Sequence, residues 1–305
     1  MDAIKQLITE HDSIIIIAHV RPDGDCIGST QGLAQTIRHE FPTKKVYVRY
    51  EALDYLAFLG VPDDVEDRIF AESLVISLDT ANRDRIYDQR FSRGKALLRI
   101  DHHPHIDYFG DIDYVDTSSP STCNIITRLL TEFGWEIPAG AAIALYTGIT
   151  TDTGRFRYRG VSEQTLRQAA DLLKTGIQPV DIYDQLYARD LLQVHFLGTF
   201  LSQAQTANGV IYVVLHQQEI KDSGLTEDQA ANYISHLSDI NGYPIWFLAY
   251  QTTEGIWRVR LRSSGVVINE VASRYHGGGH PQASGCQLTS IDQLPEFIAD
   301  LERLL

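Results

Sequence analysis

The sequence predicts an α/β protein with an N-terminal parallel-sheet domain and a smaller C-terminal α+β domain. Over the first two-thirds of the chain, short apolar runs alternate with helical patterns, as in a parallel sheet with crossover helices. After about residue 205, strand-like runs dominate instead. The length of 305 residues also corresponds to two domains of about 150 residues each. We therefore expect an N-terminal domain at 1–185, a helical linker at 186–205 and a C-terminal domain at 206–305.

Four strands and four helices are expected in the N-terminal domain. The strands are aliphatic or β-branched runs bounded by polar turns, at 14–17, 46–48, 74–78 and 96–100. The helices are expected at 28–40, 120–133, 139–149 and 162–175. Ser118 and Ser119 before Pro120 favour a helix start, and Gly176 favours the end of the last helix.

The helical pattern continues from 181 to 205, where tyrosines and leucines recur at three- and four-residue spacing. In the C-terminal domain, strands are expected at 209–216, 244–251 and 256–262, and a helix at 227–237.

Composition and charge exclude several classes of protein. With 44% hydrophobic and 22% charged residues, the chain is neither disordered nor fibrous. Its net charge of −14 repels long polyanions, so we expect no long duplex nucleic acid as a partner. No apolar run approaches the ~20 residues that span a bilayer, which predicts no membrane partner. No secretory leader pattern is visible, so we expect a cytoplasmic protein, with Cys26, Cys123 and Cys286 as reduced thiols without a metal-binding role.

Histidine and aspartate side chains follow three of the four N-terminal strands. The run at 14–17 leads into His19, Asp23 and Asp25, the run at 74–78 into Asp79, and the run at 96–100 into Asp101, His102 and His103. Asp152 is expected in a glycine-bounded loop after an apolar helix. Because ligand sites of open parallel sheets form beyond the carboxyl ends of the strands, we expect these groups to converge.

Carboxylates gathered in one crevice must be protonated, paired or bound to metal. Aspartates and histidines without a thiolate favour Mn²⁺ or Mg²⁺ over a structural zinc site. Each segment alone is also compatible with a turn or a surface loop, and their joint position at strand ends favours the metal site. Asp101 is expected to be a hydrogen-bonding partner rather than a ligand.

Two neighbouring metal ions suit in-line displacement at phosphorus, so the sequence predicts phosphoester hydrolysis. The segment Gly24–Thr30 lacks the lysine of a Walker loop, and no Gly-x-Ser-x-Gly elbow is present. We therefore expect neither nucleoside triphosphate binding by that loop nor covalent acyl chemistry.

The C-terminal domain carries two further signals. Arg258, Arg260 and Arg262 alternate with Val259 and Leu261, which places the arginines on one face of a strand. Such a row suits phosphates and base edges, although it also suits a solvated edge strand. The glycine-rich turn expected at 276–285 exposes backbone amides, which favours phosphate or ribose binding over a plain turn.

These motifs resemble the DHH phosphoesterases. The likeness rests on His19-x-x-x-Asp23-x-Asp25, Asp79, Asp101-His102-His103 and Asp152, and the segment ending at His280 is similar to the associated C-terminal domain of that family. Within the superfamily the chain looks most like the NrnA family of bacterial nano-RNases, through Arg21-Pro22-Asp23 and segments 148–157, 258–263 and 267–272. Proteins of that family degrade very short RNA and dephosphorylate adenosine 3',5'-bisphosphate (pAp).

The resemblance implies a role for each matching residue. His19, Asp23 and Asp79 would hold one Mn²⁺, and Asp25, Asp79, His102 and Asp152 the other. His103 would contact the scissile phosphate and is taken with Asp101 as catalytic. Arg260, Arg262, Gly278, Gly279 and His280 would bind the nucleotide. Cys26 stands where alanine or serine is expected, and His276 where glycine or asparagine is usual.

The implied function is hydrolysis of short oligoribonucleotides to mononucleotides and of pAp to AMP, by a hydroxide that two metal ions activate. A homodimer is left open. Three other functions remain as alternatives: a phosphodiesterase of linear or cyclic dinucleotides such as pApA or cyclic di-AMP, a manganese-dependent pyrophosphatase, and a non-catalytic nucleotide-binding protein.

Overall fold

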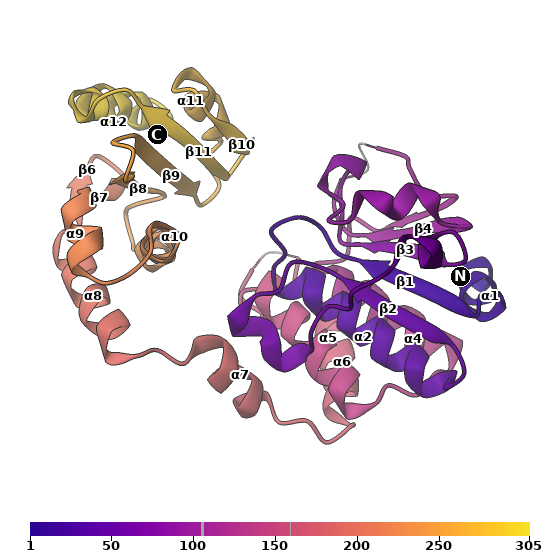
Figure 1. Ribbon diagram of the computed structural model, residues 1–305. Helices are drawn as coiled ribbons and strands as arrows, with labels where there is room; N and C mark the ends of the chain where they lie inside the picture. Colours follow the sequence, from indigo (N-terminus) through magenta and orange to yellow (C-terminus); the bar gives the residue numbers. More distant parts are fainter. Residues whose placement is uncertain (105–106, 159) are drawn as a thin grey trace. The chain divides into compact units, whose positions relative to one another are not determined.

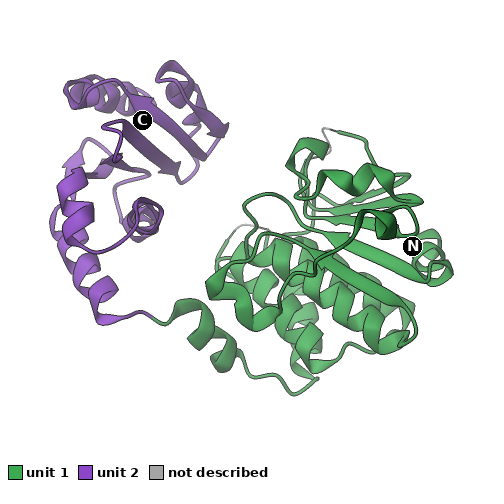
Figure 2. Ribbon diagram, in the orientation of Figure 1, with its two compact units in different colours: residues 1–188 green, residues 189–305 purple. Residues whose placement is uncertain are grey.

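The structure is a computed structural model that describes residues 1–104, 107–158 and 160–305 (Figure 1). The chain divides into two compact units, which we call unit 1 (Met1–Ala188) and unit 2 (Arg189–Leu305) (Figure 2). The domain boundaries expected from the sequence stay a prediction, and the two units are described separately below.

Unit 1 is built on a five-stranded parallel sheet with the order β2-β1-β3-β4-β5. The strands are β1 (Ser13–Ile17), β2 (Lys45–Arg49), β3 (Leu74–Leu78), β4 (Ala96–Asp101) and β5 (Ile112–Val115). The expected parallel sheet is confirmed. Only β5 was not predicted from the sequence, because it has four residues and none of them is fully buried.

Seven α-helices are found in the described part of unit 1: α1 (Asp2–Glu10), α2 (Gly24–Glu40), α3 (Asp67–Phe70), α4 (Thr122–Phe133), α5 (Ala139–Asp152), α6 (Glu163–Leu173) and α7 (Pro179–Tyr187). Helices α2, α4, α5 and α6 lie on one side of the sheet (Figure 1). Ile14 and Ile16 of β1 belong to the apolar core on that side, whereas Ile15 and Ile17 belong to the core on the other. The alternation of side chains along a strand therefore buries both faces of the sheet.

Helix α6 begins one residue later and ends two residues earlier than predicted, and three further helix boundaries differ from the sequence prediction. Helix α2 begins at Gly24 rather than at residue 28, because the Asp23 carboxylate caps it. Helix α4 is capped by Ser121, so Pro120 precedes the helix instead of lying in its first turn. Helix α5 continues to Asp152, which is therefore its last residue and not part of a loop.

Unit 2 contains a mixed six-stranded sheet with the order β10-β11-β9-β8-β7-β6, in which only β7 and β8 pair in parallel. The strands are β6 (Gln205–Ala207), β7 (Val210–Leu215), β8 (Ile245–Gln251), β9 (Trp257–Ser263), β10 (Gly278–His280) and β11 (Ala283–Leu288). The helices are α8 (Leu191–Ser202), α9 (Gln217–Asp222), α10 (Glu227–Ala231), α11 (Asn269–Arg274) and α12 (Leu294–Glu302). This confirms the α+β class of the C-terminal part.

The glycine-rich segment of unit 2 is not a simple turn. It forms β10 and pairs antiparallel with β11, with Gly278 opposite Gly285. A Cβ atom on Gly277 would collide with the backbone of Gly285 and Cys286. These glycines therefore allow close approach of two strands, which a local sequence pattern does not reveal.

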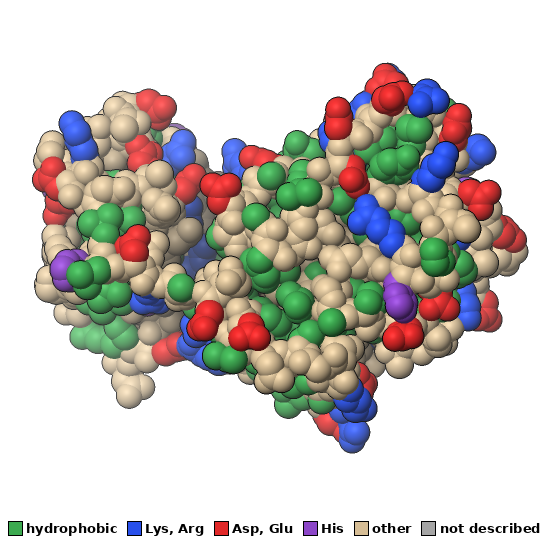
Figure 3. All heavy atoms as spheres, turned by 60° about the horizontal axis from the view of Figure 1, so that its bottom comes forward, with side chains coloured by type: hydrophobic (Ala, Val, Ile, Leu, Met, Phe, Trp, Pro, Cys, Tyr) green, Lys and Arg blue, Asp and Glu red, His purple; other side chains and the backbone are tan. Residues whose placement is uncertain are grey.

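Acidic, basic and apolar side chains are interspersed on the face of the molecule shown in Figure 3. None of the helices in the described ranges is long and apolar enough to cross a membrane.

Candidate metal centre

The candidate site lies in unit 1, at the carboxyl ends of β1, β3 and β4. Helices α2 and α4 contribute their N-termini, and α5 contributes its C-terminus. Eight residues that the sequence singled out come from these elements: His19, Asp23, Asp25, Asp79, Asp101, His102, His103 and Asp152. The structure thus brings together side chains that are separated by up to 133 residues in the sequence.

Asp79 is the central carboxylate of the site and is 2% exposed. Its Oδ2 atom lies 3.5 Å from His19 Nε2, whereas its Oδ1 atom lies 3.4 Å from His102 Nε2 and 3.5 Å from His103 Nδ1. The Thr122 hydroxyl donates to Oδ1 at 2.9 Å and holds the carboxylate in this orientation. One oxygen of Asp79 therefore faces His19, and the other faces His102 and His103, with which Asp79 forms one of the clusters that could hold an ion.

The backbone of Asp79 is held in the left-handed region, with φ 55°. Its amide donates to the carbonyl of Ile100 at 3.0 Å, which ties the residue to the neighbouring strand β4. Non-glycine residues adopt this conformation at an energetic cost that is common at functional sites.

His102 forms a second group with Asp25 and Asp152. Its Nε2 atom lies 3.4 Å from Asp152 Oδ2 and 4.0 Å from Asp25 Oδ2. One ligand atom from each of these residues lies within 4.8 Å of the others, so a single ion could contact all three.

Asp25 is fixed by the N-terminus of α4. The amides of Thr122 and Cys123 donate to its two oxygens at 2.6 and 2.9 Å. Hydrogen bonds from a helix N-terminus favour the charged carboxylate, and they orient it although it is fully buried.

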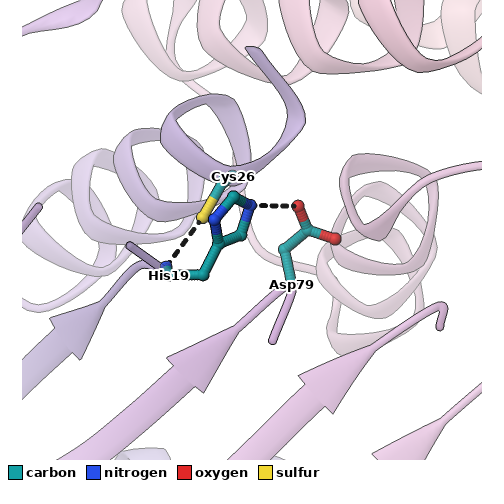
Figure 4. A group of neighbouring side chains, drawn as sticks. All are labelled: His19, Cys26 and Asp79. Atoms are coloured by element: carbon teal, nitrogen blue, oxygen red, sulfur yellow. Dashed lines mark hydrogen bonds and ion pairs between the residues drawn. The ribbon is translucent and has the colours of Figure 1, made fainter. Parts of the chain in front are cut away.

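A third group consists of His19, Cys26 and Asp79, whose ligand atoms also lie within 4.8 Å of one another (Figure 4). His19 Nδ1 lies 2.9 Å from the carbonyl of Val20, so this nitrogen carries the proton and Nε2 faces Asp79. The sequence analysis expected a donor set without sulfur and no such role for Cys26. The Cys26 thiol lies beside His19 and Asp79, so a sulfur is also among the groups that could hold an ion.

Asp23 is the N-cap of α2. Its Oδ1 atom accepts from the amides of Asp25 and Cys26 at 3.1 and 3.0 Å. Among the described residues, the clusters that could hold an ion do not include Asp23. Burial is the main cause of the raised pKa of Asp25 and of Asp79, and the charge of Asp23 raises both further.

Asp101 and His103 form a hydrogen-bonded pair next to these groups. His103 Nδ1 lies 2.8 Å from Asp101 Oδ1, and Arg99 Nη2 donates to Asp101 Oδ2 at 2.6 Å. Burial alone would raise the pKa of Asp101, but His103 and Arg99 lower that pKa to about 2. Burial lowers the pKa of His103, yet the Asp101 carboxylate outweighs it and the pKa of His103 is raised.

Arg99 was missed by the sequence analysis. It is fully buried, and besides Asp101 it donates to the carbonyls of Thr80, Ala81 and Asp107. It therefore ties the segment that follows Asp79 to the segment that contains His103. The available signal was a single charged residue within the apolar run at 96–100.

Without a bound cation, the negative charges of Asp25, Asp79 and Asp152 are only partly balanced by neighbouring positive charge. Burial, followed by the charges of neighbouring aspartates, raises the pKa of Asp152 to about 9 and that of Asp79 well above its usual range. Burial also raises the pKa of Asp25. A cluster of buried oxygen and imidazole donors with this excess of negative charge fits divalent cations.

The expected nucleotide-binding residues lie in unit 2. Arg262 of β9 pairs in register with Ala283 of β11, and Ala283 with His280 of β10, so these residues share one end of the sheet. Arg262 Nη1 donates to the carbonyls of Leu261 and Ser284. Arg260 donates to Asn232 Oδ1 at 2.8 Å and lies 3.6 Å from Asp228.

Gly278 and Gly279 differ in their surroundings. Gly279 has φ 137°, and a Cβ atom there would lie 2.7 Å from the carbonyl oxygen of Ala283. Gly278 has nothing within 4 Å of such an atom. Packing against Ala283 thus explains why a glycine is needed at position 279. No such contact requires a glycine at position 278, where the absent side chain leaves open space beside the strand.

Comparison with known proteins identifies the family to which these two units belong. Residues 13–149 match the model of the DHH family N-terminal domain, and residues 207–305 match the DHHA1 domain. The chain is 38% identical over 301 residues to the bifunctional oligoribonuclease and PAP phosphatase NrnA of Bacillus subtilis, covering 97% of this chain and 96% of that protein. It is 37% identical over 312 residues to the probable NrnA of Streptococcus mutans, covering 100% of both proteins.

Two further matches are more distant. The cyclic-di-AMP phosphodiesterase GdpP of Geobacillus thermodenitrificans is 23% identical over 98% of this chain and 49% of that protein. The crystal structure of an exopolyphosphatase-related protein from Bacteroides fragilis has a TM-score of 0.89 at 24% identity, covering 99% of this chain and 96% of that one, and shows the same fold. The identities and coverage of the two NrnA relatives establish that this chain belongs to the DHH phosphoesterase family, in the group of the NrnA proteins.

Proposed function

We propose that this protein is a phosphoesterase dependent on two divalent metal ions, with Mn²⁺ as the preferred ion. It hydrolyses short oligoribonucleotides to mononucleotides and removes the 3'-phosphate of pAp to give AMP. The names of the NrnA relatives support these two activities. The geometry of Asp79 supports the two-ion site.

The observation that carries the proposal is the position of Asp79 between His19 and His102. One carboxylate oxygen lies 3.5 Å from His19 Nε2, and the other lies 3.4 Å from His102 Nε2. These separations are too long for strong hydrogen bonds, but they suit atoms that share a cation. A carboxylate with a different imidazole at each oxygen is a natural bridge between two ions.

We divide the ligands into two sets, one for each ion, which share Asp79. His19, Asp23 and Asp79 hold one ion, whereas Asp25, Asp79, His102 and Asp152 hold the other. The assignment of Asp23 uses the carboxylate oxygen that does not cap α2. The preference for Mn²⁺ over Mg²⁺ follows from the imidazole nitrogens, which a harder ion binds less readily.

Bound divalent ions supply a water of lowered pKa and neutralise the negative charge of the phosphate. The chain's own residues then orient the reacting groups. His103 is proposed to donate from its ring to the scissile phosphate, while Asp101 stabilises the protonated imidazole through its 2.8 Å contact. No side chain in this proposal forms a covalent intermediate.

Unit 2 is proposed to bind the nucleotide. Arg262 and Arg260 offer guanidinium donors, and the open edge at Gly278, Gly279 and His280 offers backbone and imidazole groups. Arg260 contacts Asn232 and Asp228, and Arg262 donates to the carbonyls of Leu261 and Ser284, so both guanidinium groups are held by unit 2. The net charge of −14 disfavours long RNA and supports a preference for short substrates.

A substrate panel tests the proposed function. The purified protein is assayed with pAp, a short oligoribonucleotide, cyclic di-AMP and pyrophosphate, in the presence of Mn²⁺, in Mg²⁺ and after chelation. We expect AMP from pAp and mononucleotides from RNA with Mn²⁺, and neither after chelation. Asp79→Asn purified in parallel controls for contaminating nucleases.

Each alternative function predicts a different result from this panel. Preferential turnover of cyclic di-AMP would favour the dinucleotide phosphodiesterase, to which the distant likeness to GdpP also points. Turnover of pyrophosphate alone would identify a pyrophosphatase. Binding of pAp without turnover of any substrate would identify a nucleotide-binding protein.

A further inference from the structure

We propose that Cys26 is a sulfur ligand of the ion held by His19 and Asp79, so that this half of the site binds thiophilic divalent ions such as Co²⁺ and Zn²⁺ more tightly than oxygen and nitrogen donors alone would. The inference rests on the proposed metal site. It concerns the one candidate cluster among the described residues that contains a thiol.

The three donor atoms lie close enough together to bind one ion. The sulfur, a nitrogen of His19 and an oxygen of Asp79 all lie within 4.8 Å of one another. Two atoms bound to the same ion are separated by at most about 4.4 Å, the sum of typical metal–sulfur and metal–nitrogen distances of about 2.3 and about 2.1 Å. A small contraction of the cluster around an ion is therefore sufficient for all three contacts.

The packing of α2 holds the backbone of Cys26 in place beside the site. Cys26 is fully buried in the first turn of α2, where its amide donates to the Asp23 cap at 3.0 Å. The same turn is pressed against α5, because a Cβ atom on Gly24 would lie 2.5 Å from Thr151 Oγ1. The backbone that carries the sulfur is therefore fixed relative to the site.

The hydrogen bonds of the Cys26 sulfur leave it available to an ion. It accepts from the amide of His19 at 3.1 Å (Figure 4). Its own proton has a long contact of 3.9 Å to the carbonyl of Leu78. Because the contact that it donates is long, the sulfur loses little hydrogen bonding when an ion replaces its proton. Burial and the charges of Asp79 and Asp23 raise the pKa of the free thiol, so the compensating positive charge has to come from the ion itself.

Binding of the ion to the Cys26 sulfur releases one proton. The divalent ion replaces the thiol proton, which leaves to the buffer, and a sulfur–metal bond forms without oxidation or reduction. A thiolate is a soft donor and selects thiophilic ions, whereas alanine or serine at this position would leave only harder donors. Cys26 would therefore alter which metal the protein retains, while leaving the position of Asp79 unchanged.

Cobalt spectroscopy tests this inference on the full chain. Metal-free protein is titrated with Co²⁺ in the absence of oxygen, and absorption is recorded in the visible and near-ultraviolet. We expect visible d–d bands together with a near-ultraviolet sulfur-to-cobalt charge-transfer band. Cys26→Ser and Cys26→Ala should lose the charge-transfer band and retain the d–d bands.

The matched control is Cys123→Ala, which removes the other buried thiol of unit 1. Cys123 Sγ lies 3.5 Å from the carbonyl oxygen of Asp25 and is in none of the described candidate clusters. This variant should keep the charge-transfer band. Calorimetric titration should show that Cys26→Ser weakens Zn²⁺ binding by about tenfold or more and changes Mn²⁺ binding much less.

The outcomes separate the inference from the function on which it rests. Visible bands without a charge-transfer band in the unmodified protein, or a band that Cys26→Ala retains, would overturn the assignment of Cys26 and leave the metal site intact. Absence of all cobalt bands would overturn both. Circular dichroism of each variant confirms that lost bands do not reflect unfolding.

Discussion

Arg99 and Asp101, two residues apart on β4, form an ion pair of 2.6 Å with both side chains completely buried. The pair connects the interior of unit 1 to its candidate metal centre, because the other Asp101 oxygen contacts His103. Arg99 also donates to backbone carbonyls in two segments beside the site. One buried guanidinium thus holds the catalytic candidates and the neighbouring loops in a fixed arrangement.

Removal of the guanidinium should therefore destabilise the protein strongly. Arg99→Met leaves the Asp101 carboxylate buried without its cation, and we expect a loss of about 3–5 kcal/mol in the free energy of unfolding. Arg68→Met is the control, since Arg68 pairs with Glu66 on the surface and its removal should change the free energy of unfolding much less. Urea denaturation measures both. Equal losses in the two variants would show that the buried pair has no special role.

Asp79→Asn should separate metal binding from folding. Asparagine tolerates the left-handed backbone at φ 55°, and it removes one charge from a crowded group of aspartates. We expect the metal-free variant to melt no lower than the unmodified protein, whereas Mn²⁺ should no longer raise its melting temperature. Activity should fall by about 100-fold or more.

The control for this variant is Asp64→Asn, which removes an exposed carboxylate of unit 1. It should keep both the activity and the stabilisation by Mn²⁺. Full Mn²⁺ stabilisation of Asp79→Asn would exclude Asp79 as a bridging ligand.

The strands and their polar ends were predictable because local patterns determine them. The aliphatic runs at 14–17 and 74–78 leave few alternatives to buried parallel strands, and the side chains after such strands gather at one edge of the sheet. The features that the sequence did not predict depend on contacts between residues that are distant in the sequence or lie in different elements. Cys26 reaches His19 only through the turn into α2, and β10 becomes a strand only by pairing with β11.

The glycines of β10 allow binding and folding to be tested separately. Gly278→Ala places a methyl group in open space, so the protein should fold normally while its KM for pAp rises about tenfold through obstruction of the proposed nucleotide site. Gly279→Ala requires a backbone with φ 137° and a contact of 2.7 Å with Ala283, so it should lower the melting temperature. Steady-state kinetics and thermal unfolding measure the two effects. An unchanged KM for Gly278→Ala would remove this edge from the nucleotide site.

The hydrogen bond between Tyr275 and Asp300 should make the stability of unit 2 decrease as the pH rises in the alkaline range. The Tyr275 hydroxyl donates to Asp300 Oδ2 at 3.0 Å, and burial with this hydrogen bond raises the pKa of Tyr275 to about 12. Because the folded pKa lies above the unfolded value, the contribution is complete below about pH 10 and is lost as the pH rises towards 12.

Tyr275→Phe keeps the ring against Phe297 and removes only the hydroxyl. We expect the unmodified protein to be more stable than this variant by about 1–2 kcal/mol near neutral pH, with the difference shrinking above about pH 10. Denaturant unfolding at several pH values measures it. A difference that stays constant up to about pH 12 would contradict the assignment.

The central claim is that Asp79 bridges two metal ions, and anomalous X-ray diffraction from crystals grown with Mn²⁺ tests it most directly. The account predicts two manganese peaks in unit 1, with one oxygen of Asp79 bound to each, His19 at the first ion and His102 at the second. A single peak, or two peaks that do not share Asp79, would contradict it.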